Sequence, residues 1–439
     1  MIRPRRLGEI IAWGLGLVPV VLWFVAGPEV PVGRRGVEAW PFLVIGQVAG
    51  LVGMALLSVS FVLSARLRGL EDYFGGLDGM YRTHHRVGLA AFGFLLLHPV
   101  ALALRFVPAD WGRAVAFLLP GHARWAVNLG VYALWGMILL LGVTLTARVP
   151  YDKWKLSHKG LGLVLLGGAV HMWFVEGTRG MRVAVAEHAA LWGYMTAIVG
   201  LGLAGAVYKI VVLPLWPKPR YTVAGVERLN DDVVEVTLTP QGEPIDFVPG
   251  QFVFVTFYGA GLTRESHPYT LCGPADAETL TITVKALGDY TRRLCERLEA
   301  GIEASLEGPY GRFDYRDGGD RQIWIAGGVG VAPFLSWTRN MARDGTTTRD
   351  VDFYYCVHDR SDAVYREEFG AISQQLPNVH VALVCSVEDG HLHADDIGDV
   401  TDADVFMCGP KRLTTDLRRQ FRRRGVPDRR IHYEDFEFR

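Results

Sequence analysis

Six long apolar segments in the amino-terminal half constrain the fold of this chain more than any other feature. They lie at about residues 7–26, 42–65, 86–107, 126–147, 157–175 and 185–214 of 439. The hydrocarbon core of a bilayer is about 30 Å thick, and a helix of about 20 apolar residues crosses it. Residues 1–216 are therefore predicted to form an all-α six-helix membrane bundle, and the remainder is predicted to be a soluble α/β protein.

The Lys and Arg residues beside these segments predict how the helices cross. Cytoplasmic flanks carry an excess of such residues, and here the excess lies on the side shared by both chain ends, for example at Arg66 and Lys153. This places the soluble half in the cytoplasm, in a multi-pass protein of the cell (inner) membrane. The first segment has no convincing small-residue cleavage site and is expected to be a retained helix.

The cysteines and the net charge limit the function classes. All five cysteines lie in the soluble half and none form C-x-x-C pairs, so a four-cysteine iron–sulfur cluster is not indicated. Scattered free thiols fit a reducing compartment. The net charge of −1 gives no argument for nucleic acid as a partner, and the sequence does not indicate an oligomeric state.

Four histidines inside apolar segments are unusual, because ionisable groups are costly in a membrane. His84 and His98 are 14 residues apart, which on an ideal helix leaves them within about 40° of one face and about 21 Å apart. His85 would lie about 140° from His98, so His84 is the better partner. His158 and His171 are 13 residues apart, so their helix would need a bulge or a tilt to aim both inward.

These spacings predict two haems stacked across the bilayer. His84 is expected to pair with His158 near the cytoplasm, and His98 with His171 near the outside. Two imidazoles fill both axial positions of a haem iron, which leaves no site for a substrate and is typical of electron transfer. The alternative is that the histidines only pack between helices, but four of them at matching heights favour haem.

The soluble half divides into two predicted domains after the Pro-rich exit at residues 216–219. Short alternating strands at 221–226, 233–238 and 252–257 predict an antiparallel β-barrel over residues 217–318. From residue 319 to 439, apolar strands alternate with glycine turns and helices, for example at 323–326 and 352–357. That pattern is typical of a parallel α/β nucleotide-binding domain.

Four short motifs occur in a fixed order along this half. They are His267-Pro268-Tyr269-Thr270, Gly288-Asp289-Tyr290-Thr291, Gly328-x-Gly330-x-x-Pro333 and Cys408-Gly409-Pro410. The first offers an aromatic ring and a hydroxyl to a flat cofactor, the second opens a helix whose amides suit a pyrophosphate, and the third lets a backbone approach phosphates. Each alone is more often a simple turn or packing feature, so their order carries the inference.

With these motifs in this order, the soluble half resembles the ferredoxin–NADP reductase superfamily. Joined to a bis-histidine membrane domain, the whole chain resembles the ferric reductase / NADPH oxidase family. The resemblance implies FAD, two b-type haems and a nicotinamide nucleotide as cofactors. The residues implied for FAD are His267, Pro268, Tyr269, Thr270, Gly288 and Thr291, and those for the nicotinamide nucleotide are Gly328, Gly330, Pro333, Cys408 and Gly409.

The resemblance also implies catalytic roles for Thr270 and Cys408 beside the reacting rings, and for an aromatic residue at the carboxyl end. Residues His432 to Phe436 resemble the family's terminal His-x-Glu-x-Phe, in which the aromatic ring covers the flavin. Because three residues follow Phe436 here, either Phe436 or Phe438 could hold that place.

Arg360 and Ser361 are candidates for the 2′-phosphate of NADPH, since arginine binds phosphate bidentately. The neighbouring Asp359 would instead favour NADH. NADPH is the expected nucleotide, with NADH as the alternative.

The predicted function is transmembrane electron transfer by a flavohaem oxidoreductase. Cytoplasmic NAD(P)H would reduce FAD, and electrons would pass singly through two haems to oxygen, forming superoxide, or to a ferric chelate. One alternative is delivery to a quinone or a periplasmic redox protein. Another is a haem-free, membrane-anchored flavin sensor.

Overall fold

The computed structural model describes residues 7–27, 34–67, 69–146, 151–175, 188–259, 261–275, 277–345 and 347–434. The chain divides into two compact units. One comprises Met1–Gly75 with Gly79–Trp216, and the other comprises Gly76–Asp78 with Pro217–Arg439. Each unit is described by itself.

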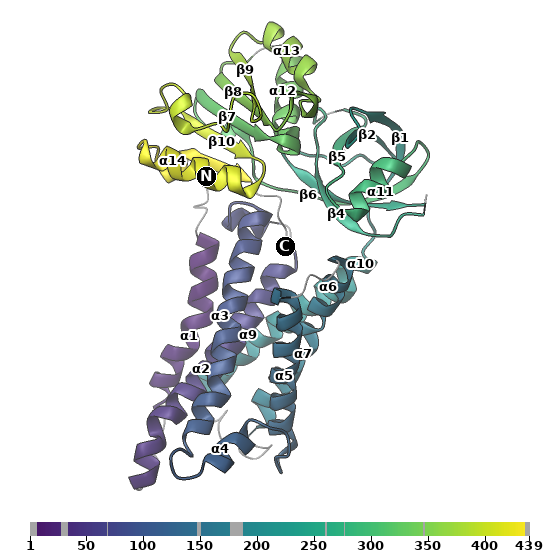
Figure 1. The fold of residues 1–439 in the computed structure, drawn as a ribbon. Coiled ribbons are helices and arrows are strands. Elements are labelled where there is room, and N and C mark those ends of the chain that lie inside the picture. The colour runs from purple at the N-terminus through teal and green to yellow at the C-terminus, as the bar shows by residue number, and fades with distance from the viewer. Residues whose placement is uncertain are drawn as a thin grey trace. The chain divides into compact units, whose positions relative to one another are not determined.

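The first unit is a bundle of helices that run alongside one another (Figure 1). Its helices are α1 Leu7–Val25, α2 Arg34–Ser64, α3 Leu77–Leu104, α4 Trp111–Phe117, α5 Trp125–Thr146, α6 Tyr151–Lys159, α7 Leu161–Phe174, α9 Ala189–Val207 and α10 Leu213–Leu215, with a π-helical turn at Tyr208–Val212 between the last two. Most of the long helices in this unit are apolar around their whole circumference, as expected for helices that face lipid, whereas α6 carries several polar and charged residues.

Five of the described helical stretches are long and apolar enough to cross a membrane. They are Leu7–Val25, Trp40–Ser64, Leu77–Leu104, Trp125–Leu145 and Ala189–Leu215. The sixth predicted span, at 157–175, instead falls on two shorter helices, α6 and α7, which meet at Gly160.

The junction at Gly160 has a local cause. The Gly160 amide donates to the Ser157 carbonyl at 3.0 Å, which is the tighter i→i+3 pattern. A Cβ atom at Gly160 would also lie 3.1 Å from Leu140 of α5, so a larger residue would push the two helices apart. Hydropathy along the sequence does not register such a distortion, whereas the 13-residue spacing of His158 and His171 predicted one.

The second unit begins with an antiparallel sheet of six strands, in the order β4-β3-β6-β1-β2-β5. The strands are β1 Arg220–Arg228, β2 Val233–Pro240, β3 Phe252–Tyr258, β4 Ser266–Thr270, β5 Leu280–Lys285 and β6 Glu303–Tyr310, and the helix α11 Asp289–Arg297 follows β5. One bridge between Leu271, which directly follows β4, and Ile282 of β5 links the two edge strands. The predicted antiparallel sheet is confirmed, and we call this part the antiparallel domain.

A parallel sheet of five strands follows, in the order β11-β10-β7-β8-β9. Its strands are β7 Arg321–Gly327, β8 Asp350–Val357, β9 Val379–Cys385, β10 Asp404–Cys408 and β11 Ile431–Glu434, and its helices are α12 Ala332–Asp344, α13 Arg366–Gln375 and α14 Lys411–Arg423. This confirms the predicted α/β domain. The chain proceeds from β7 to β8 on one side and returns to β10 on the other, so the strand order reverses between β7 and β10. Ligands of such sheets bind at the carboxyl ends of the strands beside that reversal.

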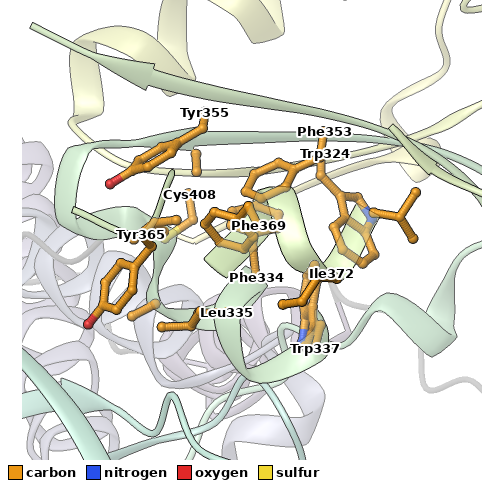
Figure 2. Close-up of a cluster of buried hydrophobic side chains, with 14 of the residues drawn as sticks. Trp324, Phe334, Leu335, Trp337, Phe353, Tyr355, Tyr365, Phe369, Ile372 and Cys408 are labelled. Carbon is orange, nitrogen blue, oxygen red and sulfur yellow. The ribbon is translucent and has the colours of Figure 1, made fainter. Parts of the chain in front are cut away.

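Aromatic rings fill the core on one face of the parallel sheet (Figure 2). Trp324 of β7 and Phe353 of β8 pack against Phe334 and Trp337 of α12, with ring centroids 4.9 to 6.0 Å apart. All four side chains are fully buried. The position of α12 on the sheet is therefore fixed by large, close-packed groups.

Candidate functional site

Two pairs of histidines lie between α3 and the α6–α7 segment. The rings of His84 and His158 have centroids 6.2 Å apart, and so do the rings of His98 and His171. Imidazoles bound to opposite sides of one metal ion, with bonds of about 2 Å, have centroids about 6 Å apart. Each pair therefore has the separation that a shared metal ion requires.

The ring proton of three of these histidines is fixed by a main-chain carbonyl. The Nδ1 atoms of His84, His98 and His171 lie 2.9, 2.7 and 2.8 Å from the carbonyl oxygens of Ser60, Gly46 and Ala126. A carbonyl can only accept, so Nδ1 carries the proton and Nε2 keeps its lone pair. This is the arrangement that orients metal-binding histidines.

Glycines allow the imidazoles to lie so close to the neighbouring helices. A Cβ atom at Gly50 of α2 would be 2.7 Å from Nδ1 of His98, and one at Gly130 of α5 would be 2.6 Å from Nδ1 of His171. Both distances are well below van der Waals contact. A side chain at either position would displace the ring.

His158 is held differently from the other three. Its Nδ1 atom is buried and has no hydrogen-bond partner among the described residues, and its ring stacks on Trp154 with centroids 5.4 Å apart and planes at 16°. The turn at Gly160 lies between His158 and His171, at the place where the 13-residue spacing required a distortion. His85, the competing candidate, is exposed, whereas His84 faces His158.

Each histidine pair offers two imidazole ligands to a metal ion. Among the described residues there is no cluster of three or more His, Cys, Asp and Glu side chains that could hold one. An ion held by only two imidazoles must bring its remaining ligands with it, as the iron of haem does. The donor set of this chain therefore fits haem.

Two buried tyrosines mark the candidate flavin site in the antiparallel domain. The hydroxyl groups of Tyr269 on β4 and Tyr290 on α11 are buried without a partner among the described residues. Burial raises the pKa of both phenols, so both remain protonated donors. Buried donors normally have partners, and a bound polar cofactor would supply them.

His267 and Thr291 already have partners within the chain. The ring of His267 stacks on Tyr290 at 4.4 Å, and its Nε2 lies 3.0 Å from Oε2 of Glu265. The hydroxyl of Thr291 accepts from the amides of Leu287 and Gly288 at 3.0 Å each, which caps α11. Pro268 and Thr270 lie on β4, opposite Phe254 and Phe252 of β3.

Two glycine turns meet at the carboxyl ends of β7 and β10. A Cβ atom at Gly330 would lie 2.6 Å from the carbonyl oxygen of Cys408, and one at Gly409 would lie 2.9 Å from the backbone of Gly327. Gly328 has a positive φ of 55°, which suits glycine. The structure therefore brings the third and fourth motifs together at the strand reversal, where Pro333 lies in the first turn of α12.

The candidate 2′-phosphate residues follow β8 and are bound to carboxylates. Nε of Arg360 lies 2.8 and 2.7 Å from the two carboxylate oxygens of Glu388. Ser361 donates its hydroxyl to Asp359 at 2.8 Å. An incoming phosphate would have to displace both acids.

The last described strand, β11, leads to the candidate terminal aromatic. Its final residue, Glu434, lies beside Cys408 of β10 in the sheet, and a Cβ atom at Gly311 of the antiparallel domain would be 3.4 Å from Oε1 of Glu434. Phe436 and Phe438 themselves lie outside the described residues. Glu434 thus lies at the junction of the two domains.

Sequence reasoning did not identify Tyr290 or Ser60 as site residues. Tyr290 stands inside a motif that was read for its glycine and threonine, and its burial became evident only in three dimensions. Ser60 supports His84 through its carbonyl and its hydroxyl, both 2.9 Å from Nδ1. No residue pattern in α2 could have signalled a main-chain acceptor.

The fold defines the class of protein: a membrane-embedded helical domain carried by an FAD- and NAD-binding oxidoreductase. Three family models match the chain in this order. They are the ferric reductase like transmembrane component over residues 49–169, the FAD-binding domain over 219–314 and the oxidoreductase NAD-binding domain over 324–419. The chain belongs to the ferric reductase / NADPH oxidase family.

Curated relatives match the soluble half. The reductase component of propane 2-monooxygenase from Rhodococcus jostii is 30% identical over 237 residues, which is 49% of this chain and 63% of that protein. The ferredoxin–NAD(+) reductase component of the alkene monooxygenase system from Xanthobacter autotrophicus is 32% identical over 242 residues, 51% of this chain and 72% of that protein. The chain thus covers less than two thirds of the Rhodococcus protein.

Among solved structures, the flavohemoglobin of Malassezia yamatoensis is similar to 91% of this chain and 98% of its own, with 18% identity and a TM-score of 0.47. The FAD/NAD-binding domain of the Vibrio cholerae nitric oxide dioxygenase is similar to 50% of this chain and 98% of its own, with 22% identity and a TM-score of 0.45.

Proposed function

We propose that this protein carries electrons across the cell membrane, from cytoplasmic NAD(P)H through FAD and two b-type haems to an acceptor outside. The acceptor is oxygen, which would become superoxide, or a ferric chelate. One observation carries this proposal: two histidine pairs with the same 6.2 Å separation in the membrane unit of a chain that also contains a flavin reductase module.

FAD and haem would supply the redox chemistry when bound, because FAD exchanges electrons in pairs or singly and bis-imidazole haem exchanges them singly. The chain binds and orients them. His84 with His158, and His98 with His171, would hold the two irons through Nε2. The main-chain carbonyls behind three of these rings keep the proton on Nδ1, so that Nε2 is ready to ligate.

In the soluble unit, the phenols of Tyr269 and Tyr290 would donate to the flavin nucleotide, and Thr270 would lie at the isoalloxazine ring. Gly328, Gly330 and Gly409 would let main-chain amides approach the phosphates of the nicotinamide nucleotide, with Cys408 near its ring. Close packing of the two turns leaves no room for a side chain at Gly330 or Gly409.

Absorbance and acceptor assays on the purified, membrane-reconstituted protein test the proposal. We expect a reduced b-type α band, two haems per chain by pyridine haemochrome, and NAD(P)H-driven reduction of either oxygen or a ferric chelate on the opposite side of the vesicle. A protein that carries flavin but no porphyrin would overturn the proposal and favour a flavin sensor. Electrons reaching only a quinone would overturn the assignment of the acceptor.

Replacing Glu388 with glutamine should improve the use of NADPH relative to NADH. The change removes the carboxylate that binds Arg360 and leaves its guanidinium available to a 2′-phosphate. Because both side chains are exposed and screened by solvent, we expect the ratio of kcat/KM for NADPH to that for NADH to rise by about fivefold. An unchanged ratio would mean that Arg360 does not meet the 2′-phosphate.

Deleting Phe436 to Arg439 should change the rate at which nicotinamide reduces the flavin, by at least about threefold if a terminal ring covers the reacting site. Stopped-flow bleaching of the flavin measures this rate. Replacing Phe436 and Phe438 singly with leucine then shows which of the two rings covers the flavin. Rates identical to wild type in all variants would mean that neither aromatic residue takes part in the site.

A further inference from the structure

Arg339 of α12 lies at the centre of a buried polar cluster that joins the two domains of the soluble unit. Its Nη2 lies 3.1 Å from Oε2 of Glu235 on β2, in the antiparallel domain. Its Nε and Nη2 lie 2.6 and 2.9 Å from the two carboxylate oxygens of Glu368 on α13, in the α/β domain. Only 18% of the Arg339 side chain is exposed, so one guanidinium binds acids of both domains away from bulk water.

A tyrosine of the α/β domain, Tyr365, also belongs to this cluster and bonds to residues of the antiparallel domain. The hydroxyl of Tyr365, whose ring lies at the edge of the aromatic core (Figure 2), donates to Oε2 of Glu235 at 2.9 Å and lies 2.6 Å from the hydroxyl of Thr283 on β5. Burial raises the pKa of this phenol, so it remains a donor. Glu235 is thus held by two partners from the other domain.

The same helix binds the segment that directly follows β4. We call β4 the flavin strand, because it carries the proposed flavin residues Tyr269 and Thr270. Arg339 donates to the carbonyl of Cys272 at 3.2 Å, Ser336 donates to that of Gly273 at 3.0 Å, and Asn340 accepts from the amide of Ala275 at 3.1 Å. Cys272 is only two residues beyond Thr270. Side chains along one face of α12 therefore fix the end of the strand that carries the proposed flavin residues.

The amino-terminal end of α12 follows the turn Gly328–Val331, which is proposed to bind the nicotinamide nucleotide and which we call the nicotinamide turn. Ala332 is the first residue of α12, and only Val331 separates Gly330 from the helix. A helix is a stiff element that advances about 1.5 Å per residue. A shift of α12 against the antiparallel domain would therefore move the nicotinamide turn relative to the flavin strand by a similar amount.

We propose that Arg339, together with Glu235 and Glu368, is a positioning residue that sets the distance between the nicotinamide and the flavin. The inference rests on the proposed function, because it concerns the step in which the two rings must meet. Misplacement of reacting groups by about 1 Å can cost about 100-fold in rate. None of the three residues is among those proposed to contact either ring, so we expect their effect to be on the reduction rate and not on the chemistry of the cofactors.

The test uses the full-length protein, purified with FAD and mixed anaerobically with NADH in a stopped-flow instrument. For Arg339→Met we expect flavin reduction at saturating NADH to be at least about tenfold slower per bound flavin, with FAD content retained and a weaker charge-transfer absorbance between nicotinamide and flavin. Arg339→Lys keeps the charge but not the planar fork, and should be intermediate. Arg343→Met, at an exposed position of the same helix, is the matched control and should match wild type.

The outcomes separate positioning from simple stability. A wild-type reduction rate and charge-transfer band in both Arg339→Met and Arg339→Lys would overturn the inference, and so would a loss of FAD with a normal rate in the flavin that remains. Should the Arg339 variants not fold, Tyr365→Phe removes one donor at nearly constant volume and must then show the slower reduction. A wild-type protein whose flavin neither NADH nor NADPH can reduce would instead overturn the proposed function.

Discussion

Replacing His98 with alanine is expected to lower the haem content of the purified protein from two to one per chain while leaving the FAD content unchanged. His98 and His171 face each other across 6.2 Å, and one remaining imidazole cannot fill both axial positions of an iron. Delivery of electrons to the outside acceptor should then fall to background. Pyridine haemochrome analysis and a reduced-minus-oxidised spectrum measure the haem content directly.

His85→Ala is the matched control for this experiment. The residue lies on the same helix, next to His84, but is exposed and takes no part in either histidine pair. It should keep both haems. Equal haem content in His98→Ala and wild type would contradict the ligand assignment.

Replacing Gly330 with valine is expected to slow the reduction of flavin by NAD(P)H by at least about 100-fold. The first side-chain atom alone would lie 2.6 Å from the carbonyl oxygen of Cys408, and this partner is main chain that cannot rotate away. The two turns would separate, and this would displace the main-chain amides that are proposed to bind the phosphates of the nicotinamide nucleotide. Flavin and haem should both remain bound, since their proposed residues lie elsewhere, and dithionite should reduce them normally.

Gly398→Ala provides the comparison for this prediction. A Cβ atom at Gly398 would meet no heavy atom within 4 Å, so the same domain receives a new methyl group without a clash. Its reduction rate should match wild type. If Gly330→Val also matched wild type, the glycine turns would not be the nicotinamide site.

The sequence predicted those parts of the fold that depend on local periodicity. Apolar runs of bilayer length identified five helices that the structure shows as long and apolar, and alternation identified the antiparallel sheet that precedes the parallel one. The helical repeat favoured His84 over His85, and the structure places His84 opposite His158. Each of these inferences needs only the spacing of residues along one element.

Contacts between distant segments could not be predicted in the same way. Arg339 meets Glu235 across 104 positions of the chain, and Tyr365 meets it across 130. Periodicity shows which face of α12 is buried, but it does not show which acidic residue of the antiparallel domain contacts that face. The spacing of His158 and His171 predicted a distortion in their helix, but it did not predict that the distortion would be a break at Gly160.

The supports behind His98 and His171 are carbonyls of the peptide backbone, which every amino acid provides. A substitution at an exposed position of α2 or α5 therefore leaves these hydrogen-bond acceptors in place, as long as the small residues at the crossing points stay small. A lineage could rewrite the lipid-facing sequence almost entirely and still keep the imidazoles in place.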